Sequence, residues 1–138
     1  MVAGNVGAVQ NAVDCGVRVT DEFLVDSFTI GSVHPAVFNA IAACTPIETR
    51  RALGIIETYS AAAAIVAADG AVKSADVELI EIRLAAGLAG KSFLTMTGDV
   101  GSVDAAVEAG LRALSEHGMV LSHVVIPSPS PELWASIA

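Results

Sequence analysis

The side chains that could do chemistry are few in this 138-residue chain, and their spacing matches no catalytic motif. His34, His117 and His123 lack the His-x-x-x-His spacing that would put two metal ligands on one helix face. Ser128 and Ser130 have no histidine and acid in a motif typical of a nucleophilic serine. No acid is paired with a base as an enzyme would need. The sequence therefore predicts neither a catalytic site nor a metal site.

One lysine has a charged partner within the same predicted helix. Lys73 follows Asp69 by four residues, a spacing that places both side chains on one helix face and lets them pair. Lys73 also lies near the end of this helix, where the helix dipole favours a cation. The residues alone therefore indicate a local stabilising contact.

A glycine-containing stretch, residues 87–91, joins two predicted strands. Gly87 and Gly90 suit a tight reversal, because glycine adopts backbone conformations that other residues avoid. The backbone amides of this stretch, together with Lys91, would offer hydrogen-bond donors and a positive charge to an anion. The residues alone predict a hairpin turn.

The two cysteines, Cys15 and Cys44, do not form a disulfide framework, and a reducing cytoplasm fits them best. Cys15 falls inside a predicted helix and Cys44 in a predicted linker. Both are expected to be buried structural side chains.

The composition is apolar and acidic. Hydrophobic residues make up 54% of the chain, the mean hydropathy is +0.66, and only 16% of residues are charged. Some apolar surface is therefore expected to be buried against other chains. No apolar run reaches the roughly 18 residues of a membrane span, and no signal peptide is expected. The net charge of −8, without a stripe of lysine and arginine, argues against a nucleic-acid partner.

Hydrophobic spacing predicts an α+β fold in which amphipathic helices cover one face of an antiparallel sheet. Ser60 and Asp99 are each expected to cap the helix that follows. The predicted elements are strand 52–57, helix 60–75, strands 77–85 and 91–97, helix 100–116, strand 119–126 and a short helix over 131–137.

An internal repeat connects the two ends of the chain. Residues 4–13 match residues 98–107 at an offset of 94, with six of ten positions identical. After two extra residues the match resumes at an offset of 96, as in the pair Phe38 and Trp134. A period near 95 residues indicates duplication of a whole domain.

The first copy is expected to be partial. Residues 1–45 would supply only the second helix of the unit, over 6–19, and its last strand, over 24–30, before a short helix that follows His34-Pro35. Residues 46–138 would form a complete second copy. The predicted strand 24–30 should be held by the second domain or by another chain, because its own sheet partners are absent from the first copy.

Several linked phrases in this second copy resemble the bacterial microcompartment shell domain, called the BMC domain. They are ALGIIET (52–58), AADGAVKSADVEL (67–79), the loop before Lys91, TGDVGSVDAAVEAG (97–110) and VVIP (124–127). The resemblance runs continuously over residues 52–127. It implies the family's α+β fold, a ferredoxin-like variant with helices on one face of an antiparallel sheet, and a structural function without catalysis.

The resemblance also implies roles for two sets of residues. In this family the lysine at the position of Lys73 lies on the tile edge, and the family often has arginine where this chain has Ser128. The tile-edge residues implied are Asp69, Lys73 and Ser128, and the residues implied to line the central pore are Gly87, Leu88, Ala89, Gly90 and Lys91.

Some tandem members of the family carry an iron–sulfur cluster at the symmetry axis. Neither Cys15 nor Cys44 lies on the loop that should face this axis, so the sequence does not support a cluster and no cofactor is expected.

The implied function is that of a tandem-domain shell tile in the bacterial cytoplasm. Three two-domain chains would form a pseudohexameric ring, so the expected partners are further copies of the chain, as a trimer or hexamer-like ring, and other shell proteins. No nucleic-acid or membrane partner is expected. The alternative is a small-molecule-binding regulatory module of similar α+β build, in which a ligand would raise the melting temperature by mass action. An enzyme ranks third.

Overall fold

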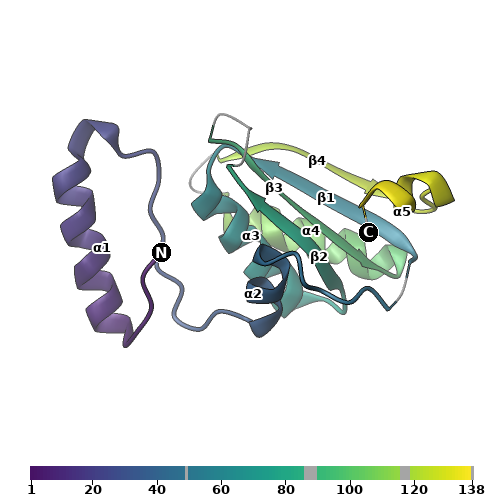
Figure 1. Ribbon diagram of the computed structural model, residues 1–138, viewed down its shortest axis with the longest axis horizontal. Coiled ribbons are helices and arrows are strands. Elements are labelled where there is room, and N and C mark those ends of the chain that lie inside the picture. The colour runs from purple at the N-terminus through teal and green to yellow at the C-terminus, as the bar shows by residue number, and fades with distance from the viewer. Residues whose placement is uncertain (49, 86–89, 116–118, 138) are drawn as a thin grey trace.

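The computed structural model describes residues 1–48, 50–85, 90–115 and 119–137, and its body is a four-stranded antiparallel sheet (Figure 1). The order of the strands is β2-β3-β1-β4. The α+β fold expected from the sequence is confirmed. Its elements are α1 (Val6–Thr20), the 3-10 turn η1 (Asp21–Phe23), α2 (Pro35–Ile41), β1 (Ala52–Thr58), α3 (Ala61–Ser74), β2 (Glu78–Leu84), β3 (Ser92–Gly98), α4 (Val100–Ala113), β4 (Val120–Ile126) and α5 (Pro131–Ile137).

The central strand β1 separates the two faces of the sheet. Ala52 and Ile56 belong to the main core beneath α3 and α4, whereas Leu53 points to the opposite face. This alternation follows from the two-residue period of a strand. On the opposite face Leu53 packs with Ile80 and with Trp134 of α5, so the short C-terminal helix covers one part of that face.

Strand β2 departs from simple alternation. Leu79 and Ile82, three residues apart, both enter the main core, while Ile80 joins the cluster on the other face. The register with β3 shifts between Leu79 and Glu81, as a β-bulge produces when one strand carries an extra residue. The bulge explains why this strand contains more consecutive apolar residues than a half-buried strand requires.

Small residues let α3 and α4 lie close to each other and to the sheet. Five alanines of α3 are buried in the main core. At Gly110 of α4, a Cβ atom would lie 3.1 Å from the carbonyl oxygen of Ala67 and 3.0 Å from Ile56. At Gly54 of β1, a Cβ atom would lie 2.7 Å from Val103. The helix layer therefore lies at a separation that larger side chains would not permit.

The first helix, α1, lies apart from this body (Figure 1). None of its residues is buried. The helix predicted over 6–19 is confirmed, and its start is fixed by Asn5, whose side chain accepts a hydrogen bond from the backbone N–H of Gly7.

The prediction of a strand over residues 24–30 is wrong, because the structure has no strand there. The equivalent strand of the second copy, β4, pairs with β1, and β1 is already bonded on both sides by β3 and β4. The segment is nevertheless in contact with the second copy, since Asp26 bonds to Ser60 and Phe28 packs on the main core.

In the part of the chain that the structure describes, no helix is both long and apolar enough to cross a membrane.

The close packing at Gly54 gives a testable expectation. Gly54→Ala should lower the free energy of unfolding by about 1–3 kcal/mol, because the added methyl group overlaps Val103 in a packed core. Gly101→Ala is the matched control, since a Cβ atom there meets nothing within 4 Å and alanine favours a helix interior. Thermal melting of both variants checks this, and equal melting temperatures would contradict the packing described.

Candidate functional site

The most extensive contact made by the first copy is with β2, and it also contacts one side of α3. Residues 26–41, here called the strap, run from the N-terminus of α3 to its last turn and end in α2. Within the strap, Val37 and Ala40 are fully buried, and α2 packs on β2 and α3. We call this receiving surface the α3–β2 face.

Asp69 is the central polar group of this face. Its carboxylate is nearly buried, and Oδ1 accepts a hydrogen bond from the backbone N–H of His34 at 2.7 Å. Oδ2 lies 2.5 Å from Nζ of Lys73, which also donates to the backbone carbonyl of Ser32. The pairing of Lys73 with Asp69 predicted from their spacing is confirmed. A buried carboxylate needs such partners, because leaving one unpaired is costly.

A second polar contact lies at the other end of α3. The hydroxyl of Ser60 donates to Oδ2 of Asp26 at 2.5 Å and accepts from the backbone N–H of Ala63 at 3.0 Å. Ser60 is therefore the N-cap of α3, as predicted. The strap is therefore hydrogen-bonded near both ends of α3. Its helix, α2, packs on β2 and α3.

Sequence reasoning did not assign Ser32, His34 or Asp26 to this site. The internal repeat could have indicated Ser32, because it matches Ser32 with Ser128, a predicted tile-edge residue. The contacts of Ser32 and His34 use backbone atoms, which no side-chain pattern reveals.

The three predicted tile-edge residues do not all lie together in the structure. Asp69 and Lys73 lie together, whereas Ser128 is exposed in the turn after β4. Among the contacts of the described residues, none joins Ser128 to this pair.

The predicted pore residues fall partly outside the described residues, namely Gly87, Leu88 and Ala89. Gly90 is exposed with φ +89°, a left-handed conformation that glycine adopts without strain. Lys91 is half-buried immediately before β3. The base of the connection is closed by the hydroxyl of Ser92, which accepts from the N–H of Ala85 at 3.1 Å.

The expectation of buried cysteines is wrong, since Cys15 and Cys44 are both exposed free thiols. Cys15 is exposed because α1 packs against no core, whereas its counterpart in the repeat, Ala109, is buried in α4. Cys44 follows α2, and its thiol contacts the carbonyl oxygen of Ala42 at 3.2 Å.

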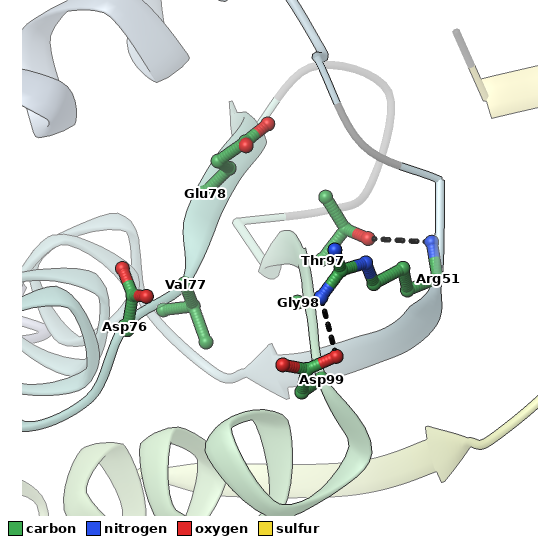
Figure 2. Close-up of a pocket in the computed structure, with 7 residues that line it drawn as sticks. All are labelled: Arg51, Asp76, Val77, Glu78, Thr97, Gly98 and Asp99. Atoms are coloured by element: carbon green, nitrogen blue, oxygen red, sulfur yellow. Dashed lines mark hydrogen bonds and ion pairs between the residues drawn. The ribbon is translucent and has the colours of Figure 1, made fainter.

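A small polar pocket of about 160 Å³ lies where β3 meets α4 (Figure 2). Asp99 occupies the N-cap position there, but its side chain makes no capping bond. Asp99 is thus the N-cap residue of α4, as predicted, but its carboxylate bonds to the guanidinium of Arg51 at 2.5 Å and not to a backbone N–H of the helix. This ion pair is exposed and contributes little to stability. The lining residues are Arg51, Asp76, Val77, Glu78, Thr97, Gly98 and Asp99.

No group of three or more histidine, cysteine, aspartate or glutamate side chains could hold a metal ion within the described residues.

Comparison with known proteins places this geometry in a family. The model of the BMC domain matches residues 52–129, which is more than half of the chain. The chain is 39% identical over 134 residues to the bacterial microcompartment shell protein PduT of Citrobacter freundii, covering 97% of this chain and 73% of that protein. It is 41% identical over 85 residues to PduA of the same organism, covering 61% of this chain and 88% of the relative.

A solved structure agrees with the sequence matches. A microcompartments protein from Desulfitobacterium hafniense DCB superimposes with a TM-score of 0.82 at 49% sequence identity. The superposition covers 96% of this chain and 73% of the other. With its four-stranded sheet, its helix layer and the matched segment 52–129, the chain belongs to the BMC domain family of bacterial microcompartment proteins.

Proposed function

We propose that this protein is a structural tile of a bacterial microcompartment shell. The observation that carries the proposal is the match of residues 52–129 to the BMC domain, on a fold that has the corresponding sheet and helices. PduT and PduA, which the chain resembles, are both shell proteins by name. The tile would assemble with other copies and with other shell proteins. The regulatory-module alternative gains no support, because the relatives are shell proteins.

We propose further that the first 45 residues are the back half of a first BMC domain. The chain would then belong to the tandem-domain type, which carries two BMC domains in one chain. The support is a comparison of α1 with α4. Val103 and Val107 are buried in α4, whereas their counterparts in the repeat, Val9 and Val13, are not buried. An apolar stripe of this kind favours burial against a strand and helix like β1 and α3. Three such chains would form a ring with pseudo-sixfold symmetry.

The end of α3 is the proposed tile edge. The side chain of Lys73 is 41% exposed, and its ammonium group is fixed by Asp69 and by the strap. A lysine held in this way covers apolar surface with its stem and presents its head at a defined place. Ser128 would lie at the same edge in the neighbouring unit.

The loop over 87–91 is proposed to line the opening of the ring. Gly90 and Lys91 are the members that the structure describes, and they combine an exposed backbone with a positive charge. Repeated around an axis, such groups favour anions in spite of the net charge of −8, because the local field depends on the nearest groups.

Size-exclusion chromatography with light scattering tests the ring. The apolar, weakly charged chain should elute as a ring or a larger assembly at micromolar concentration, because its exposed apolar residues favour burial between copies. The dependence of mass on concentration separates a specific ring from open-ended aggregation. A monomer at these concentrations would refute the tile for this chain.

Electron microscopy of two-dimensional sheets tests the tile edge. Lys73→Ala should leave the ring intact but reduce the extent of sheets, since the anchored ammonium group at the edge is lost. Arg112→Ala is a matched control, because Arg112 also forms an i,i+4 pair, with Glu108, on the exposed surface of α4. Sheets of equal extent from the native protein and Lys73→Ala would show that Lys73 acts only within its own chain.

Crystals grown with sulfate test the opening. An anion should bind near Gly90 or Lys91, and Lys91→Glu should abolish this binding without loss of helix or sheet signal by circular dichroism. Arg18→Glu makes the same change of charge on α1 and should leave the anion in place. A ring with residues 90 and 91 far from its axis would contradict the pore role.

A further inference from the structure

A series of polar contacts connects the strap with the end of the sheet at which β2 and β3 are joined. Asp26 of the strap accepts a hydrogen bond from the hydroxyl of Ser60, the N-cap of α3. The carbonyl oxygen of Ser60 accepts from the hydroxyl of Thr58 at 2.8 Å. The same hydroxyl lies 3.3 Å from the carbonyl oxygen of Ser92, whose own hydroxyl accepts from the N–H of Ala85 at 3.1 Å. Each contact in the series therefore shares a residue with the next.

Thr58 and Ser92 are polar residues at positions where apolar ones would serve for packing. Both side chains are fully buried, and by strand alternation they lie on the same side of the sheet as Ile56 and Leu94 of the main core. A buried hydroxyl is costly unless it is hydrogen-bonded, so valine and alanine would pack here without that requirement. What the two hydroxyls add is a fixed position for the backbone groups that they contact.

Ser92 lies between the ends of β1 and β2. It pairs with Thr58 of β1 on one side and with Leu84 of β2 on the other. The residue after β2, Ala85, has a φ of +56°, a left-handed conformation that residues other than glycine adopt at a cost. The hydroxyl of Ser92 bonds to the N–H of this strained residue. Ser92 thus holds the direction in which the backbone leaves β2.

We infer that Thr58 is a positioning residue, whose hydroxyl ties the base of the loop that carries Gly90 and Lys91 to the N-cap of α3. The inference rests on the proposed function in one respect, since it gives this loop the role of lining the opening. Through Ser60 the tie extends to Asp26, so the contact of the strap with α3 is coupled to the base of the loop. A change in the strap would then alter how firmly the loop base is held.

Hydrogen exchange at the backbone amide of Ala85 measures how firmly the loop base is held. Thr58→Val keeps the shape of the side chain and removes the hydroxyl, so this amide should exchange about fivefold faster. Thr58→Ser keeps the hydroxyl and should restore an exchange rate close to the native one. Thr97→Val is the matched control, because Thr97 is also fully buried and accepts from the N–H of Arg51 at the opposite end of β3. Exchange at Ala85 in this control should equal that of the native protein.

A double-mutant cycle tests the coupling to the strap. Asp26→Ala removes the partner of the N-cap hydroxyl and should accelerate exchange at Ala85 about twofold. The same substitution in the Thr58→Val variant should have no further effect, because the series of contacts is already interrupted there. Asp14→Ala makes the same substitution on α1, where Asp14 is bonded to Gln10, and should leave the exchange rate at Ala85 unchanged.

Three results would overturn the inference. Equal exchange rates at Ala85 in Thr58→Val and Thr58→Ser would show that the hydroxyl does not hold the loop base. Equal acceleration in Thr58→Val and Thr97→Val would show a general loss of stability in place of a local tie. Additive effects of Asp26→Ala and Thr58→Val would show that the strap and the loop base are independent.

A second variant keeps the test decisive if Thr58→Val does not melt cooperatively. Ser92→Ala interrupts the series at the next residue, and Asp26→Ala should then add nothing to its effect on Ala85. The exchange rates at Ala85 do not depend on whether the loop lines an opening. Crystals grown with sulfate test that role and light scattering tests the ring, so the tie at Thr58 and the tile can each fail without the other.

Discussion

The close approach of α3 and α4 to each other, and of α4 to the central strand, is the constraint on which the rest of the structure depends. It is possible only because glycine and alanine occupy the contact, as at Gly54, Gly110 and Ala67. With its inner side committed to this contact, α3 presents its outer side to the strap. The main core is therefore continuous from the sheet through α3 to Val37 and Ala40 of the first copy.

This arrangement places a nearly buried carboxylate, Asp69, between the helix layer and the strap. The carboxylate is stabilised by a lysine of its own helix and by a backbone N–H of the strap, so it joins the strap to the helix layer. An apolar residue at position 69 could pack as well, but it would not fix where the chain turns into α2. Buried polar groups of this kind can specify position more than they contribute to stability.

The sequence predicted most of the second copy well because most of the signals there are local. Ser60 lies at the start of an alanine-rich run, and Lys73 lies one helical turn after Asp69, so capping and pairing followed from spacing alone. Asp99 shows the limit of this reasoning, because Arg51, distant in sequence, competes for its carboxylate. The β-bulge in β2 was equally hidden, since it depends on the partner strand.

The first copy was harder to predict because its structure depends on what lies beside it. Residues 24–30 carry the pattern of a strand but have no strand to pair with, and Cys15 occupies a position that is buried only in the other copy. The strap binds Asp69 and Lys73 through backbone atoms of His34 and Ser32. A pattern of side chains in the sequence does not reveal such contacts. The internal repeat still indicated which segments of the two copies are equivalent.

The short connection between the strap and β1, residues 42–51, has a thermodynamic consequence. It tethers the strap to the body that carries the α3–β2 face, so the contact forms within one molecule at an effective concentration that short linkers place in the millimolar range. The same contact between two separate chains would follow the law of mass action, whereas within one chain it is independent of how much protein a cell contains. Dilution can separate neighbouring chains, but it cannot separate the strap from α3.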